Sequence, residues 1–272
     1  MILRLGALGL GLACAAAAQE AINTDAAVQP STGSFVIREQ LMVHRAHRDP
    51  FGGQEDVTEW MPMTLINYGI FHDLAASVRI PLRYRTGDTL LGARGVDEQL
   101  DVGDLGVRLK WRVLQRDPGA LQTERLSLIG GVEFDTGDNK ISLNPDFADG
   151  STNPTLGLAY TRISGRWGVG GSAEWEFQTD GDSDAARVDA AVLYRISPTQ
   201  FHRGDAGAWY GMVESNTRYD TNGDIETFVS PGLMYEGTTW TYEASIMLPV
   251  ARELDRRAET DAILVFGVRM LF

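Results

Sequence analysis

Cysteine is almost absent from this sequence, because Cys14 is the only one. It lies in an apolar stretch, LGALGLGLACAAAA, that follows Arg4 and ends in small residues at positions 16–18. A positive residue, a short apolar run and small residues in that order predict a secretory signal peptide over residues 1–18. The chain after the signal then has no cysteine and forms no disulfide. A lipoprotein signal at Cys14 is the alternative, although Gly11 stands where such signals prefer leucine.

Long hydrophobic runs and positive charge are also scarce. After the signal no run reaches the length of about 18 apolar residues that a membrane helix needs. The chain has 24 lysine and arginine residues against 37 aspartate and glutamate residues, and its formal net charge of -13 does not suit nucleic acid. No segment has a convincing helical pattern. These absences leave a secreted protein without membrane helices, or one that crosses a membrane as β-strands.

What the sequence has instead is alternation with a period of two residues, which is typical of β-strands. In residues 104–113 the odd positions from Leu105 to Val113 are apolar, whereas the even positions include Arg108 and Lys110. We therefore expect an all-β fold without a linker or a domain break. The pattern predicts strands over residues 34–46, 58–69, 73–85, 100–113, 123–135, 154–163, 166–179, 186–196, 207–219, 225–236, 238–250 and 261–272, which are about twelve in number.

The predicted connections are short and long in turn. Residues 71–73, 164–166 and 237–238 are short, whereas DTNGD and ARELDRRAETD are longer and rich in polar residues. Outer-membrane barrels have this asymmetry, with short periplasmic turns, longer extracellular loops and an even number of strands. We expect a transmembrane antiparallel up-and-down β-barrel over residues 33–272, in the outer membrane of a Gram-negative bacterium. A short periplasmic segment over residues 19–32 would precede it.

Aromatic residues indicate which face of the strands points outward. On the apolar face they gather at both ends of the strands, as in the two belts that membrane interfaces select. A soluble core would instead place its large rings in mid-strand. Glu39 and Arg162 are exceptions, because they fall on the lipid-facing side of the predicted strands. The expected girdle beside the short turns comprises Tyr68, Trp111, Tyr160, Trp167, Tyr194, Trp209, Tyr235 and Trp240.

The last predicted strand is apolar and ends on an aromatic residue. Phe266 and Phe272 share its lipid-facing side, whereas Arg269 points into the lumen. A strand that ends in this way resembles the C-terminal signal that the barrel-assembly machinery of bacteria recognises. We therefore expect residues 261–272 to close the barrel and Phe272 to be its assembly signal.

The lumen of this barrel is expected to be strongly charged. A basic wall on neighbouring strands would face carboxylates of later strands, and opposed charges of this kind orient dipolar solutes and tune pore selectivity. The alternative is that these groups pair with one another and fill a closed lumen. The basic residues are Arg79, Arg83, Arg85, Arg108, Lys110 and Arg112, and the acidic residues are Glu133, Glu174, Glu176, Glu214, Glu226 and Glu243.

Signals for catalysis and for metal binding are weak. None of the four histidines has serine two residues later, as an outer-membrane phospholipase would. Asp135-Thr136-Gly137 matches the aspartic-protease triplet, but a turn explains it better. Asp220, Asn222 and Asp224 stand at alternate positions, as the ligands of a calcium loop do, although Asn-Gly is also a preferred hairpin turn. We expect no enzyme activity, no cofactor and no metal beyond this weak calcium candidate.

The stretch INYGIFHDLAASVRIPLRYR, with DVGDLGVRLKWRVL and GGVEFDTGDN after it, resembles an outer-membrane family labelled as transporters of the MetA pathway of phenol degradation. The G-D-L-x-x-x-x-K-W segment of that family occurs here at residues 103–111, and its T-G-D triplet at residues 136–138. The resemblance covers most of the chain and implies passage of aromatic compounds. Its motifs belong to the barrel architecture and carry little information on the solute. With so few residues before the first strand, no plug domain is expected.

The sequence thus predicts an outer-membrane channel for passive diffusion of small solutes, with aromatic or hydrophobic compounds among them. Its partners would be membrane lipid, lipopolysaccharide, the barrel-assembly machinery and a small-molecule solute. The alternative is a structural or adhesive barrel that does not conduct and binds lipopolysaccharide or a partner through its loops. A soluble secreted β-protein is a third possibility.

Overall fold

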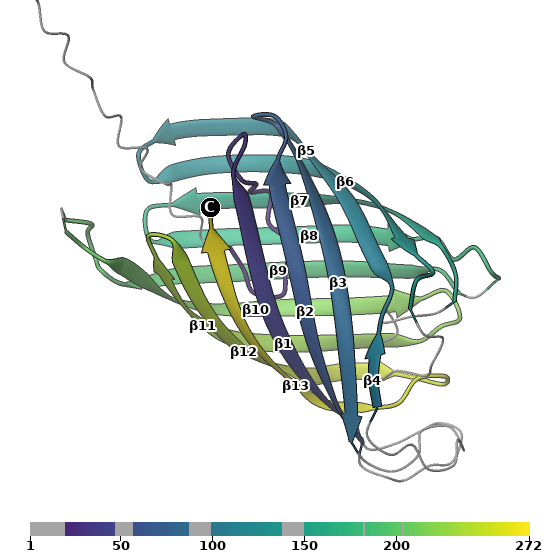
Figure 1. Ribbon diagram of the computed structural model, residues 1–272. Coiled ribbons are helices and arrows are strands. Elements are labelled where there is room, and N and C mark those ends of the chain that lie inside the picture. Colours follow the sequence, from purple (N-terminus) through teal and green to yellow (C-terminus); the bar gives the residue numbers. More distant parts are fainter. Residues whose placement is uncertain (1–19, 47–56, 87–98, 138–149, 182, 203) are drawn as a thin grey trace, which may run out of the picture.

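The computed structural model describes residues 20–46, 57–86, 99–137, 150–181, 183–202 and 204–272, so the predicted signal peptide lies outside the described residues. The described residues form an antiparallel sheet that closes on itself as a barrel (Figure 1). No helix among them is long and apolar enough to cross a membrane. The strands are β1 (Phe35–Ala46), β2 (Val57–Gly69), β3 (Leu74–Thr86), β4 (Gln99–Val102), β5 (Leu105–Gly119), β6 (Gln122–Phe134), β7 (Asn153–Ser164), β8 (Trp167–Glu176), β9 (Ala185–Ser197), β10 (Gly207–Asp220), β11 (Ile225–Gly237), β12 (Trp240–Glu253) and β13 (Thr260–Leu271).

These strands make twelve staves, because β4 and β5 follow one another along β3. The twelve predicted strands are therefore confirmed, with one difference inside the fourth. That run breaks at Gly103 and Asp104, since the Asp104 carboxylate accepts backbone N–H groups from Thr136 at 2.9 Å and from Gly137 at 2.8 Å. The G-D-L and T-G-D motifs thus meet in space, and their contact joins the start of β5 to the residues that follow β6.

The barrel closes where the first strand meets the last. β1 pairs with β2 along one edge and with β13 along the other. In Figure 1, β13 in yellow lies beside β1 in dark purple. Phe35 and Phe272 exchange two backbone hydrogen bonds of 3.0 and 2.9 Å. The prediction that the last segment closes the barrel is confirmed, and closure removes the free edges that a hydrocarbon interior does not tolerate.

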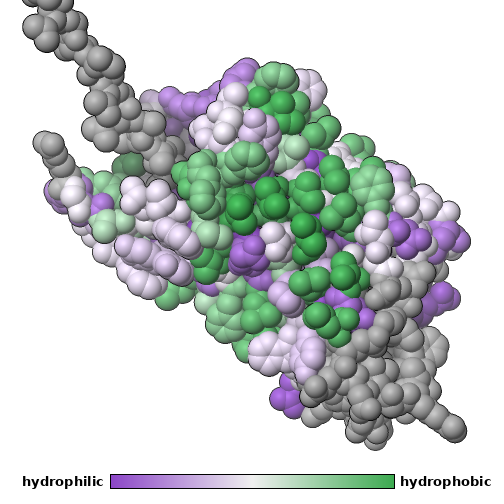
Figure 2. Space-filling view, in the orientation of Figure 1, coloured by the Kyte–Doolittle hydropathy of each residue, from purple (hydrophilic) through white to green (hydrophobic). Residues whose placement is uncertain are grey.

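Apolar side chains cover the outer surface of the barrel. Figure 2 shows them gathered across the middle of the face over the strands in front, with hydrophilic side chains toward its margins. Leu109, Trp111 and Val113 are exposed, whereas Arg108 and Lys110, at the alternate positions of the same strand, hydrogen-bond to groups inside the barrel. An apolar surface of this extent is the lipid-facing side of a membrane barrel.

Aromatic residues lie on this outer surface near the short turns, where the girdle was predicted. Tyr68, Trp111, Trp167, Trp209 and Trp240 are exposed, and the other three girdle residues are partly exposed. Glu39 and Arg162 are exposed as well, and Glu39 accepts a hydrogen bond of 2.8 Å from the Thr64 hydroxyl. Ring contacts join neighbouring strands at Phe35–Tyr68 (4.5 Å), Trp167–Tyr194 (4.6 Å) and Trp209–Tyr235 (5.1 Å).

Strand packing around Gly157 predicts a measurable cost for a single methyl group. A Cβ at Gly157 would lie 2.6 Å from the Ala173 carbonyl oxygen on β8, whereas a Cβ at Gly130 would meet nothing within 4 Å. We expect Gly157→Ala to lower the free energy of unfolding by about 1–3 kcal/mol, because backbone cannot yield as a side chain does. Gly130→Ala, on the paired strand β6, is the control. The measurement is denaturant unfolding followed by heat-modifiable mobility, and equal midpoints would contradict the close packing.

Candidate functional site

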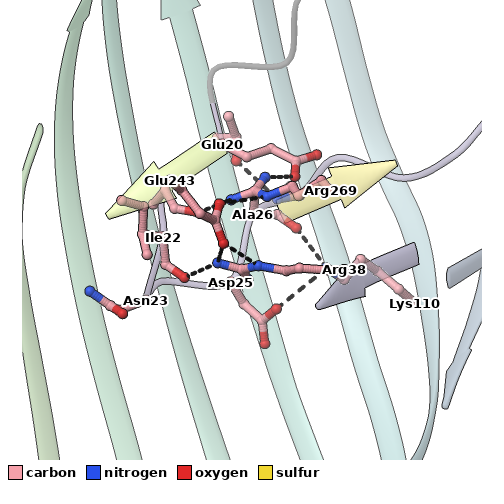
Figure 3. A network of polar contacts seen from close by, with 12 residues as sticks. Glu20, Ile22, Asn23, Asp25, Ala26, Arg38, Lys110, Glu243 and Arg269 are labelled. Carbon is pink, nitrogen blue, oxygen red and sulfur yellow. Dashed lines mark hydrogen bonds and ion pairs between the residues drawn. The ribbon is translucent and has the colours of Figure 1, made fainter. Parts of the chain in front are cut away.

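The lumen of the barrel is occupied by the chain itself. Residues 20–29, called here the plug segment, precede a turn at residues 31–34 and lie among inward-facing side chains (Figure 3). Ala21, Ile22 and Ala27 are buried, and Ile22 is only 2% exposed. A separate plug domain is not needed, because a short extended segment can fill the interior of a barrel with few strands. The sequence predicts a periplasmic segment over residues 19–32, whereas the described residues 20–29 lie inside the lumen.

Cations of the barrel wall bind the backbone of the plug segment. Peptide carbonyls that are withdrawn from water need donors, and here arginine and lysine side chains supply them. Each contact joins the plug segment to a different strand, so the segment is held at several points along its length. The contacts are Arg269 to the Ala21 carbonyl at 2.8 Å, Arg38 to the Ile22 carbonyl at 2.5 Å and Lys110 to the Ala26 carbonyl at 2.8 Å.

Glu214 on β10 accepts hydrogen bonds from backbone N–H groups of the plug segment. Its carboxylate accepts bonds of 3.1 Å from Ile22 and 2.9 Å from Asn23. The Asn23 amide also donates to the Ser245 hydroxyl on β12 at 3.0 Å. Further along, the Ala27 N–H donates to the Thr161 hydroxyl at 2.9 Å. Donors and acceptors of the plug backbone are thus both matched by the wall.

Glu243 joins the two arginines that bind the start of the plug segment. Its carboxylate lies 2.5 Å from Arg38 and 2.6 Å from Arg269, and its side chain is fully buried. Arg269 forms a second ion pair with Glu20 of the plug segment. A carboxylate between two guanidinium groups is stabilised by charge-assisted hydrogen bonds, and each group would be costly to bury alone.

The predicted basic residues on β3 and β5 are placed among carboxylates. Arg112 donates to the His72 carbonyl at a short turn, and the Arg85 side chain lies outside the described residues. The rest are ion-paired, so the positive charge is neutralised where it stands. Arg79 pairs with Glu133, Arg83 with Asp101 at 2.5 Å, Arg108 with Glu174 at 2.7 Å and with Asp25 at 3.3 Å, and Lys110 with Asp25 at 3.6 Å.

The predicted acidic residues are likewise placed against partners inside the barrel. Glu176 lies 3.1 Å from Arg187, and Glu226 lies 3.8 Å from Arg257. Glu214 differs, since its bonds go to the plug segment. Of the two arrangements that the sequence left open, local pairing in a filled lumen describes this structure, rather than two walls of unpaired charge.

Asp25 of the plug segment is stabilised in its ionised form. Burial opposes ionisation, but the positive charges of Lys110 and Arg108 outweigh that effect and hold the pKa of this carboxyl below its ordinary value. A lowered pKa means that the contribution of these ion pairs persists at neutral pH and is lost only as the pH falls through the lowered value. Acidification to mildly acid pH therefore does not discharge this anchor.

An apolar lining of methionines was missed in the sequence. Met212, Met234 and Phe228 are buried in a cluster with Ile22 of the plug segment, and other methionines of the inner face lie at Met42, Met61, Met63 and Met247. Each methionine stands an even number of positions from the inward-facing charged or polar residues of its strand, so its side chain points into the barrel as well. The same alternation that marked the charges could have found them. Methionine is flexible and polarisable, so this lining adapts to differently shaped apolar groups.

The weak catalytic and metal candidates serve turns and ion pairs. Thr136 and Gly137 of the protease-like triplet bind Asp104, and Asp138 after them lies outside the described residues. Asp224 accepts backbone N–H groups from residues 255 and 256, and Arg257 lies 3.0 Å from Asp220. Among the described residues, no group of histidine, cysteine, aspartate or glutamate side chains could hold a metal ion.

The four histidines are scattered. His44 is buried and lies 3.0 Å from the Thr260 hydroxyl, whereas His72 and His202 are exposed at the short-turn end beside aspartates. His47 lies outside the described residues. The structure brings none of the three described histidines to a serine nucleophile.

Comparison with known proteins agrees with the barrel architecture. A model of the family described as "Putative MetA-pathway of phenol degradation" matches residues 59–264. No curated protein matches the sequence. Among solved structures, the COG4313 outer membrane channel from Pseudomonas putida F1 is similar with a TM-score of 0.60 at 12% identity, over 93% of this chain and 100% of that chain. The beta domain of the Bordetella autotransporter BrkA follows with a TM-score of 0.49 at 14% identity, over 89% and 100%.

Loss of the buried Glu243 carboxylate should destabilise the barrel more than loss of a carboxylate from an ion pair on its outer surface. We expect Glu243→Gln to destabilise the barrel by about 3–5 kcal/mol, because Arg38 and Arg269 would stay buried without their shared anion. The control is Glu124→Gln, which removes a pair of 3.8 Å with the exposed Arg116 and should cost less than about 1 kcal/mol. Denaturant unfolding in lipid vesicles measures both. Similar losses for the two variants would contradict the anchoring role of Glu243.

Proposed function

The chain belongs to the family described by the MetA pathway of phenol degradation and is an outer-membrane β-barrel, and we propose that it is a channel for passive diffusion of small solutes. In this proposal the plug segment closes the lumen, and its withdrawal opens it. Solutes would then pass between the charged and the methionine-lined parts of the wall. The proposal includes no enzyme activity.

One observation carries this proposal. The centre of the lumen is filled by a short segment at the start of the chain, held by hydrogen bonds and ion pairs and by no covalent bond to the wall. A barrel closed by the side chains of its own staves could open only by deforming its sheet. With the predicted signal peptide removed, the segment would be attached at one end and could leave while the sheet stays intact, as small two-state elements do in gating.

The chemistry of the wall favours solutes with an apolar part. Apolar side chains at Met212, Met234 and Phe228 face the plug segment, while Arg38 and Glu214 offer polar contacts nearby. Concave sites that combine an apolar lining with a few placed polar groups suit small organic molecules. Aromatic or hydrophobic compounds, as the family description implies, agree with this lining.

The proposed partners follow from the barrel's surface and ends. Lipid would contact the apolar belt, and lipopolysaccharide the longer loops at one end. The barrel-assembly machinery would recognise Phe272, which ends the chain after the closing strand and is 66% exposed. A structural or adhesive barrel that never conducts is the second candidate, and the filled lumen is the observation in its favour.

A reversible lock on the plug segment tests the channel. The Asn23 amide nitrogen and the Ser245 hydroxyl oxygen are 3.0 Å apart, so Asn23→Cys with Ser245→Cys puts two thiols on facing side chains, in a chain whose own Cys14 belongs to the predicted signal. Loss of free thiol on oxidation shows that the disulfide has formed. In planar bilayers we expect discrete current steps from the reduced protein and none from the oxidised protein, since a disulfide holds the plug segment in the lumen. Ser245→Cys alone should not respond to oxidant.

Deletion of the plug segment gives a second test of the channel. A barrel from which residues 20–29 have been deleted should carry a larger and steadier current than the full chain. If that shortened barrel inserts, keeps its heat-modifiable mobility and carries no current, the channel is contradicted and the structural or adhesive role is favoured.

A further inference from the structure

Ile22 of the plug segment is held in the way that a free amino acid would be held. Its N–H donates to Glu214 on β10 at 3.1 Å, and its carbonyl accepts from Arg38 on β1 at 2.5 Å. Its side chain is buried in the apolar cluster that contains Met212 and Met234. The three groups that define an α-amino acid therefore have three separate partners on the wall, and Figure 3 shows Ile22 between its neighbours.

The niche for the Ile22 side chain exists because position 232 on β11 is glycine. A Cβ on Gly232 would lie 2.9 Å from Cδ1 of Ile22, 3.0 Å from Cγ of Met212 and 3.2 Å from Cβ of Ser245. Any larger residue at this position would fill the space that the isoleucine occupies. The missing side chain thus sets both the place and the size of the apolar niche.

Glu214 is free of cationic partners in a lumen where most carboxylates have one. It is 1% exposed, and in the described part of the chain no arginine or lysine nitrogen lies within ion-pair distance of it. Its hydrogen bonds come from Ile22, Asn23 and Thr24 of the plug segment. Once the plug segment leaves, the carboxylate loses these donors, and either water or an ammonium group would replace them.

On the other side of the niche, departure of the plug segment leaves an excess of positive charge. With the plug segment present, Arg38 and Arg269 face two carboxylates, Glu243 and Glu20. Glu20 belongs to the plug segment and leaves with it. Two guanidinium groups then share Glu243, and the donor that bound the Ile22 carbonyl is released. A ligand carboxylate would restore the balance by a charge-assisted hydrogen bond.

We propose that the niche of Ile22 is a binding site for an apolar α-amino acid. The ligand places its ammonium group on Glu214, its carboxylate on Arg38 and its side chain over Gly232, and the plug segment occupies the same site as an internal substitute. This inference rests on the proposed function, because the plug segment must leave, and it names the solute class of that channel. A residue within a peptide presents an N–H, a carbonyl and a side chain at the same places, as Ile22 does, so experiment decides between a free amino acid and a peptide.

Ligand binding is measured by saturation-transfer NMR on the full-chain barrel with Asn23→Cys and Ser245→Cys, in the reduced form. The probes are leucine, glycine, 3-methylbutylamine, which lacks the carboxylate, and 4-methylpentanoate, which lacks the ammonium group. We expect leucine to bind best, with a loss of about tenfold for each missing group. N-acetylleucine amide is the peptide probe, and tighter binding of this compound than of leucine would assign the site to peptides and overturn the amino-acid class.

Variants of the niche test the assignment of each group. Gly232→Ala should weaken leucine several-fold and leave glycine unchanged, with Gly130→Ala as the control on the outer surface. Glu214→Gln should remove the advantage of leucine over 4-methylpentanoate. Oxidation of the cysteine pair should abolish leucine binding, because the plug segment then stays in the site.

Leucine binding is measured by NMR and does not depend on a current, so the amino-acid site and the channel function can be contradicted independently. Equal affinities for leucine, glycine and 4-methylpentanoate, or leucine binding that persists in the oxidised protein, would overturn the amino-acid site while a conducting barrel would still be a channel. A barrel that binds leucine as expected but never conducts, even without residues 20–29, would instead overturn the channel and retain the site.

Discussion

Charge neutralisation inside a narrow barrel is the constraint on which this structure depends. Period-two alternation sends apolar side chains to lipid, and it therefore sends the charged residues of the same strands into a small interior. Charges there are stable only when they are paired and hydrogen-bonded. The partner can come from a neighbouring strand, as Asp101 does for Arg83. It can also come from a strand that is not a direct neighbour, as Glu243 does for Arg38.

The plug segment is the remaining part of this neutralisation. Among the described residues, the staves alone leave Lys110 without an anion and give Arg108 only Glu174, and Asp25 of the plug segment pairs with both cations. The staves also leave Glu214 without a donor, and the backbone of Ile22 and Asn23 supplies that. Closure of the lumen and satisfaction of its charges are thus one arrangement. Any opening must provide new partners for these groups, either water or a solute with matching charges.

Much of the fold could be predicted because its signal is local. Whether Leu109 faces lipid and Arg108 faces the lumen depends on one residue of offset along a strand, and that offset is visible in the sequence. The break at Asp104 could not be predicted in the same way, since its partners, Thr136 and Gly137, lie far along the chain. The candidate site was predicted only as a set of charged residues. Glu214 and Glu243 look alike in sequence, yet one binds backbone N–H groups and the other two arginines.

The sequence by itself determined the barrel: the number of staves, the outward and inward faces, the closing strand and the charged interior all follow from alternation and from the placement of aromatic residues. Only the tertiary structure decided what the interior does with those charges. Ion pairing depends on which staves lie near one another in the closed sheet and on where a short segment without periodicity comes to lie. Alternation encodes the direction in which a side chain points. It contains no information on the distance between groups that are remote in the chain. That distance is what places Ile22 between Glu214 and Arg38.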